Sequence, residues 1–181
     1  SLIQGQNPSV KNPQVSLDVS VRGRRTSDTG VPEEILSVVS RLVKVSTDLN
    51  LTSRIVYFAG PFKNTGPIPP KADTPTTYTI IWSVTNSSNQ VSNATVRARL
   101  EPYVTWVNVT EPGAEKVTYN PVGGEIIWDI GSIAPDVGIT SSPREVSFQV
   151  VLNPSVGQVG STPVIVNENT LQGVDVFTNT E

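Results

Sequence analysis

The chain has 181 residues, of which 36% are hydrophobic and 16% charged, and its formal net charge at pH 7 is −3. This apolar content can build a buried core, which excludes a disordered tail, and the apolar runs are too short to cross a bilayer. The net negative charge offers no basic surface for nucleic acid. Val, Ile and Thr number 59 in total whereas Ala and Leu number 15, and this excess of β-branched residues predicts an all-β chain.

The sequence contains no His and no Cys. This excludes Ser–His and Cys–His catalysis, zinc sites with nitrogen or sulfur ligands, and disulfides. The carboxylates show neither a calcium-loop pattern nor the spacing of a catalytic pair, so we predict no metal, no cofactor and no enzymatic activity. The first residues resemble neither an initiator nor a signal peptide, and we expect the segment to be part of a longer protein.

The N-terminal quarter of the chain is expected to hold two strands. Residues 1–10 are polar and interrupted by Pro, which predicts a frayed lead-in. Four apolar residues then alternate with polar ones in the pattern of a half-buried strand; they are Val15, Leu17, Val19 and Val21. A basic turn is expected at Gly23-Arg24-Arg25, followed by Asp28-Thr29-Gly30. Residues 32–45 also fit a helical spacing, but their β-branched content favours a long strand.

From residue 49 onward, short strands alternate with turns. The Pro-rich stretch 62–75 is expected to be a loop, because Pro fixes φ and lacks an N–H donor. Gly123-Gly124 predicts a two-residue hairpin turn. The predicted strands cover residues 51–59, 76–86, 94–100, 103–109, 116–119, 125–130, 144–152, 163–166 and 171–177. Their even spacing predicts an immunoglobulin-like antiparallel β-sandwich, preceded by an extra N-terminal β-hairpin.

Three motifs of this region are distinctive: Tyr-Thr-Ile-Ile-Trp-Ser-Val-Thr-Asn at 78–86, Pro-Tyr-Val-Thr-Trp at 102–106 and Gly-Glu-Ile-Ile-Trp-Asp-Ile-Gly-Ser-Ile at 124–133. They resemble a family of conserved-repeat, Ig-like domains in long bacterial surface proteins, formerly a domain of unknown function. The loop from Gly60-Pro61-Phe62 to Pro70 looks similar to membrane-anchored ectodomains of small-genome, uncultivated bacteria within that family. The resemblance covers about residues 49–181, and the family has no assigned catalytic or binding residues.

The resemblance implies a repeat organisation. Residues 1–47 look like the closing hairpin of a preceding repeat, and residues 48–181 like one Ig-like repeat. It further implies a non-catalytic, extracellular structural or adhesive module of a cell-surface protein or filament, anchored by a part outside this segment. A carbohydrate-binding module is the alternative. Expected partners are neighbouring repeats or copies, and surface glycans under the alternative; neither nucleic acid nor membrane contact is expected.

Strand complementation is the mode of pairing that we expect. A sandwich that lacks an edge strand has unpaired backbone groups and an open apolar groove, which an alternating strand can fill. The row Val15, Leu17, Val19 and Val21 provides this alternation. We therefore predict that the N-terminal hairpin pairs with a sandwich, either its own or that of a neighbouring copy.

Aromatic and Asn residues provide the remaining candidates. Trp82 and Trp128 lie within apolar strands and are expected in the core, whereas Trp106 is the candidate ligand contact for a sugar. Four Asn residues begin an Asn-x-Ser/Thr acceptor tripeptide, and the sequence leaves their glycan occupancy open. They are Asn50, Asn86, Asn93 and Asn108.

Overall fold

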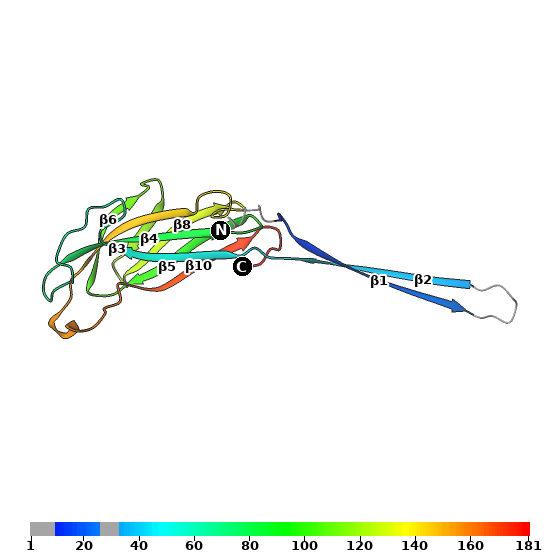
Figure 1. Ribbon diagram of the computed structural model, residues 1–181, viewed down its shortest axis with the longest axis horizontal. Helices are drawn as coiled ribbons and strands as arrows, with labels where there is room; N and C mark the ends of the chain where they lie inside the picture. The colour runs from blue at the N-terminus through cyan, green and yellow to red at the C-terminus, as the bar shows by residue number, and fades with distance from the viewer. Residues whose placement is uncertain (1–9, 26–32) are drawn as a thin grey trace, which may run out of the picture.

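The computed structural model describes residues 10–25 and 33–181. Two antiparallel four-stranded sheets form a sandwich, and a two-stranded hairpin projects from one end of it (Figure 1). This confirms the predicted all-β sandwich with an N-terminal hairpin. Residues 1–9 of the predicted lead-in and Asp28-Thr29-Gly30 lie outside the described residues. The turn expected at Gly23-Arg24-Arg25 is wrong, because these residues continue the first strand of the hairpin and stay paired with its second strand.

The hairpin consists of two strands of equal length that form a sheet of their own. They are β1 (Gln14–Arg25) and β2 (Glu33–Lys44), paired without interruption from Gln14↔Lys44 to Arg25↔Glu33. The segment whose spacing also suited a helix is therefore a strand. Its β-branched residues lose less side-chain freedom in this conformation than in a helix.

Eight strands form the two sheets of the sandwich. They are β3 (Leu49–Val56), β4 (Thr76–Asn86), β5 (Val91–Leu100), β6 (Val104–Glu111), β7 (Lys116–Asn120), β8 (Glu125–Ile133), β9 (Arg144–Leu152) and β10 (Val166–Asp175). One sheet has the order β3-β4-β9-β6 and the other the order β10-β5-β8-β7. A short 3₁₀ helix, Val156–Gln158, lies in the loop between β9 and β10.

The core lies between the two sheets and is centred on three aromatic rings. Trp82 of β4 and Trp128 of β8 are fully buried and stack with ring centroids 6.5 Å apart, and Phe148 of β9 meets Trp82 edge-on at 4.9 Å. Each indole N–H has an acceptor: Ser53 Oγ for Trp82 at 3.2 Å and Glu115 Oε2 for Trp128 at 2.8 Å. Both Trp residues are thus core residues, as predicted.

Several details differ from the sequence-based expectation. Residues 57–59, expected in a strand, follow the end of β3 at Val56, and β8 continues to Ile133, three residues beyond the predicted end. The stretches 163–166 and 171–177 were expected as two strands, but β10 is one strand that tolerates register shifts, with Glu168 at φ 54°. Gly123 and Gly124 close the β7–β8 hairpin within a loop of residues 121–124, longer than the two-residue turn expected. Both glycines have positive φ (113° and 70°), a conformation in which a side chain would be strained.

Candidate functional site: an anchored hairpin with an apolar face

The two faces of the hairpin differ in polarity. Residues directly opposite one another in an antiparallel pair project from the same face. One face, hereafter the apolar face, carries six aliphatic side chains, together with Ser37 and Arg41: Val15, Leu17, Val19, Val21, Val39 and Val43. The four that come from β1 are 51–63% exposed, so the prediction of a half-buried strand is wrong, because no other element of the described chain covers this face. On the other face β1 presents Ser16, Asp18, Ser20 and Arg22, whereas β2 adds three exposed aliphatic side chains there, those of Leu36, Val38 and Leu42.

The hairpin does not pair with its own sandwich. β1 and β2 form a separate two-stranded sheet that extends away from the sandwich (Figure 1). The expectation of pairing within the chain is therefore wrong, and pairing with a neighbouring copy stays a prediction. A two-stranded hairpin alone in water is marginally stable, and an exposed apolar patch of this kind marks an interaction surface.

The physical reason for this arrangement is a polar network that fixes the linker after β2. The Asn89 side-chain amide donates to the Val45 carbonyl at 2.9 Å and to the Asp175 carboxylate at 2.7 Å. The Thr47 N–H donates to the same carboxylate at 2.7 Å, and its hydroxyl donates to Asn86 Oδ1 at 2.7 Å. The linker therefore cannot turn back toward the sandwich without breaking several part-buried hydrogen bonds.

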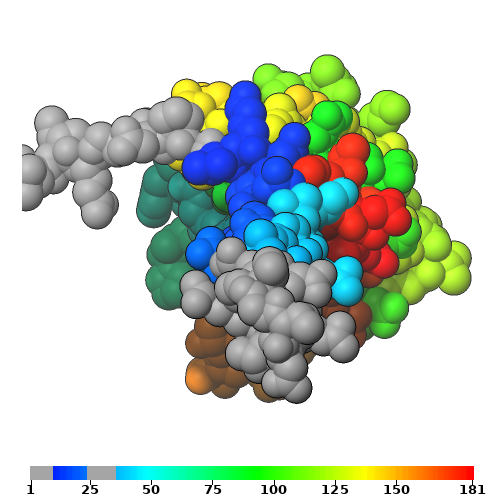
Figure 2. All heavy atoms as spheres, turned by 90° about the vertical axis from the view of Figure 1, so that its right-hand side faces the viewer, coloured from blue at the N-terminus to red at the C-terminus, as the bar shows by residue number. Residues whose placement is uncertain are grey.

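A second set of contacts holds the last residue of β2 against the C-terminal segment. Lys44 Nζ donates to the Phe177 carbonyl at 2.8 Å and lies 4.6 Å from the centre of the Phe177 ring. Ser46 Oγ lies 3.1 Å from Thr180 Oγ1. In the end-on view of Figure 2 the C-terminal residues, in red, flank the cyan strand. The base of the hairpin is thus held by Asn89 and by the C-terminal segment.

Asp175 is the central acceptor of this anchor and is almost fully buried. Burial acts to raise the pKa of Asp175, but hydrogen bonds from the Asn89 side chain and from the N–H groups of Thr47, Thr178 and Phe177 outweigh it. The pKa of Asp175 is therefore below its ordinary value. Sequence reasoning missed Asp175, Asn89 and Thr47, because no motif marks polar residues that meet only in the folded chain.

Trp106, the candidate sugar contact, is half-buried rather than free. Its ring stacks on Tyr119 with centroids 5.7 Å apart and 21° between the planes, and it lies 5.0 Å from the Phe148 ring. Its indole N–H points to Asn108 Oδ1 at 3.4 Å. The Trp106 ring thus packs against other aromatic side chains of the protein. Its contact with Tyr119 joins the edge strand β6 of one sheet to the edge strand β7 of the other.

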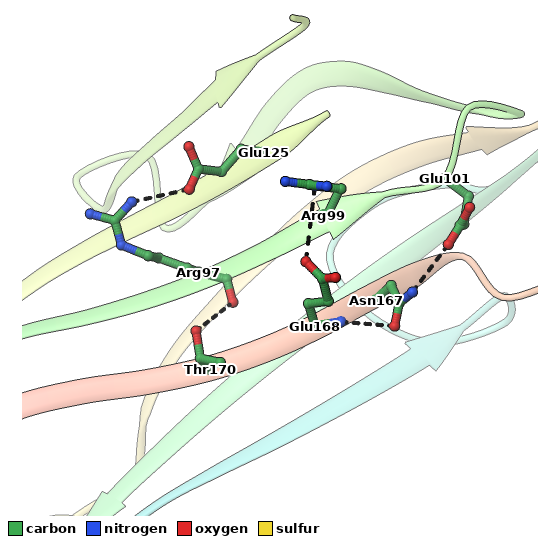
Figure 3. Close-up of polar contacts among 7 residues, drawn as sticks. All are labelled: Arg97, Arg99, Glu101, Glu125, Asn167, Glu168 and Thr170. Carbon is green, nitrogen blue, oxygen red and sulfur yellow. Dashed lines mark hydrogen bonds and ion pairs between the residues drawn. The ribbon is translucent and has the colours of Figure 1, made fainter. Parts of the chain in front are cut away.

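A group of charged and polar side chains covers the outer face of the β10-β5-β8 sheet (Figure 3). Arg97 pairs with Glu125 at 3.1 Å and Arg99 with Glu168 at 4.0 Å, while Asn167 donates to Glu101 at 3.3 Å. These pairs are exposed, so each adds little stability. Next to them is a depression of about 620 Å³ whose lining includes Arg99, Glu101, Asn167, Glu168 and Tyr119.

The four Asn residues of the acceptor tripeptides differ in accessibility. Asn50, Asn93 and Asn108 are exposed, whereas Asn86 is 1% exposed. The Asn86 amide also donates to the carbonyls of Asn89 and Ala134, at 2.7 and 2.9 Å. Asn86 is therefore a structural residue of the anchor, and a glycan cannot be attached to it in the folded chain.

Within the described residues, no group of three or more carboxylates is arranged to hold a metal ion. The same part of the chain contains no helix of the length and apolarity that a bilayer requires.

No family model matches the chain, and no curated protein matches it. Among solved structures it is similar to the chitin-binding domain of a chitinase from Pyrococcus furiosus, with 14% identity and a TM-score of 0.36, covering 70% of this chain and 94% of that one. It is also similar to the Fcho1 mu homology domain of Danio rerio with a bound Eps15 peptide, with 9% identity and a TM-score of 0.34, covering 91% of this chain and 72% of that one. Neither superposition reaches a TM-score that carries an argument about function.

Proposed function

We propose that this chain is a non-catalytic structural or adhesive repeat module of an extracellular bacterial surface protein or filament, joined to neighbouring repeats or copies through its hairpin. The observation that carries the proposal is an exposed apolar face on a hairpin whose base is fixed by buried and part-buried hydrogen bonds. A flexible linker would not need such an anchor. The family resemblance supplies the repeat organisation and the extracellular location.

The energetics indicate what kind of contact the hairpin makes. Full burial of a Val or Leu side chain contributes about 1.5–3 kcal/mol, so covering the exposed half of six such side chains yields roughly 6 kcal/mol. Association costs at least about 4 kcal/mol in lost translational and rotational freedom. This cost ranges up to about 15 kcal/mol, so the side chains alone offset only its lower end. Backbone hydrogen bonds between strands would provide the additional stabilisation and fix the register.

Sedimentation equilibrium over a concentration series tests the proposal with a matched pair of variants. Val19→Asp places a charge on the apolar face, and Ser20→Asp places the same charge one residue further, on the opposite face, which carries fewer aliphatic side chains. We expect the parent and Ser20→Asp to associate as concentration rises and Val19→Asp to remain monomeric. A parent chain that stays monomeric throughout, or equal association of both variants, would contradict the proposal.

A carbohydrate-binding module is the second candidate, because the depression beside Arg99 combines polar side chains with an aromatic residue, Tyr119. Sugar sites use this combination of ring contact and directed hydrogen bonds. A glycan array with the parent chain and with Asn167→Ala tests it. Binding lost in that variant supports this candidate, and no binding to any glycan rejects it.

A further inference from the structure

The four edge strands of the sandwich differ in how well they can accept another strand. Register shifts interrupt β10 and β6, with Glu168 and Asn108 at positive φ near the shifts, and β7 has only five residues. Bulges and short length are the devices by which proteins block an edge. By contrast, β3 pairs with β4 over eight consecutive residues without a shift. Among the described strands of the sandwich, β3 thus has the longest regular edge.

The side chains of β3 would match a neighbouring strand whose apolar side chains face the core and whose polar side chains face solvent. Leu49 and Leu51 are half-buried against the core, and Ile55 in the same row is still 47% exposed. The intervening residues Asn50, Thr52 and Arg54 are exposed on the outer face. β1 has the same two-residue alternation over Val15–Arg22. A β1 strand beside β3 would place its aliphatic row over the open side of the sandwich and its polar row toward solvent.

Charge favours the same pairing. Residues 1–45 carry six Lys or Arg and four Asp or Glu, a net charge of +2, whereas residues 46–181 carry seven and twelve, a net charge of −5. A groove of about 380 Å³ opens between the start of β3 and the end of β10, and the ionisable residues among the described ones that line it are all acidic: Asp48, Asp175 and Glu181. A basic hairpin and an acidic sandwich attract one another before contact.

We infer that the free edge of β3 is the acceptor for strand β1 of a second copy of this chain, which adds to the β3-β4-β9-β6 sheet by strand pairing. The hairpin of the same chain cannot occupy the edge, because the anchor around Asn89 and Asp175 directs it away from the sandwich. Eight paired residues extend over about 27 Å. Reciprocal pairing gives a closed dimer and head-to-tail pairing gives a chain of copies. This inference rests on the proposed function and specifies β3 as the strand with which the hairpin of a second copy pairs.

Cysteine cross-linking tests the acceptor, and the absence of native Cys means that only the introduced thiols react. One protein carries Ser20→Cys on the polar face of β1, and a second, size-tagged protein carries Thr52→Cys on the outer face of β3. The matched control replaces Thr118, exposed on the edge strand β7, with Cys. The proteins are mixed at a concentration where the parent associates and treated with a short bis-maleimide, and mixed-size conjugates are measured on a gel.

We expect at least a tenfold excess of mixed conjugate for Ser20→Cys with Thr52→Cys over Ser20→Cys with Thr118→Cys. Adding Val19→Asp to the first protein should abolish this excess. Association with equal or preferential cross-linking to Thr118→Cys would overturn β3 as the acceptor while leaving the proposed function in place. A monomeric parent with no mixed conjugate would overturn both.

Discussion

The side-chain amide of Asn89 and the carboxylate of Asp175, 86 residues apart in the chain, lie 2.7 Å apart and are both buried. The same amide holds the Val45 carbonyl at the base of the hairpin. The Asn89 Oδ1 atom is buried and has no hydrogen-bond partner among the described residues. Burying these polar groups costs free energy, and the hydrogen bonds that they form fix the direction of the hairpin. We infer that this direction is functionally important.

The contribution of Asp175 to the free energy of unfolding should depend on pH. The pKa of Asp175 is lower in the folded than in the unfolded chain, so the ionised carboxylate stabilises the fold at pH values above its unfolded pKa, near 3.9. This contribution is lost as the pH falls through the folded-state pKa. We predict that Asp175→Asn, which cannot titrate, is less stable than the parent at pH 7 and that the difference shrinks on acidification. Urea unfolding measured from pH 7 to pH 2 checks this, and parallel pH profiles would contradict it.

The core assignment predicts a large effect at Trp82. Trp82→Ala removes a fully buried ring that stacks on Trp128 and contacts Phe148, and we expect a loss of about 3–5 kcal/mol in the free energy of unfolding. Lys71→Ala, at an exposed loop position, should change it by less than about 0.5 kcal/mol. Chemical denaturation of both variants measures the two values. A Trp82→Ala variant as stable as the parent would disprove the central position of this ring.

Trp106 is predicted to contribute to packing rather than to sugar binding. Its ring lies against Tyr119 and Phe148, so Trp106→Ala should lower the free energy of unfolding by about 1–3 kcal/mol, less than for a fully buried Trp. Denaturation provides the stability, and a glycan array on the same variant provides the binding. Unchanged stability together with lost glycan binding would instead make Trp106 a ligand contact.

Salt should weaken self-association. The hairpin segment has a net charge of +2 and the remainder −5, so part of the attraction between copies is electrostatic. The Debye length falls from about 10 Å at 0.1 M to about 3 Å at 1 M salt. We predict that the dissociation constant from sedimentation rises as NaCl is raised over this range. A constant that falls with NaCl would indicate that apolar contact alone drives association.

The sequence predicted the strands because their apolar residues alternate against a single core. β4 occupies Thr76–Asn86, the range expected from its pattern. The course of β10 was harder to predict, because a residue at positive φ such as Glu168 leaves no trace in the alternation of polarity. Polarity also cannot distinguish a row of Val that faces a core from one that faces solvent. The exposure of Val15 and Val19 therefore required the structure.

The anchor and the accessibility of Asn86 could not be predicted for a different reason. Hydrogen bonds between Thr47, Asn86, Asn89 and Asp175 join segments brought together only by the fold, and a single sequence contains no signal for such pairs. The Asn86-Ser87-Ser88 tripeptide matches a glycan acceptor, yet its Asn is inside this network. Motif matches give residue types, whereas burial decides their chemistry.

The most direct test of hairpin-mediated association is amide hydrogen exchange at low and high protein concentration. Pairing of β1 with the β3 edge of a second copy would protect the outward N–H groups of both strands, whereas the edge of β7 would stay unpaired. The account predicts that exchange in Gln14–Arg25 and Leu49–Val56 slows as concentration rises, with no change in Lys116–Asn120. Exchange rates in β1 and β3 that are independent of concentration would contradict it.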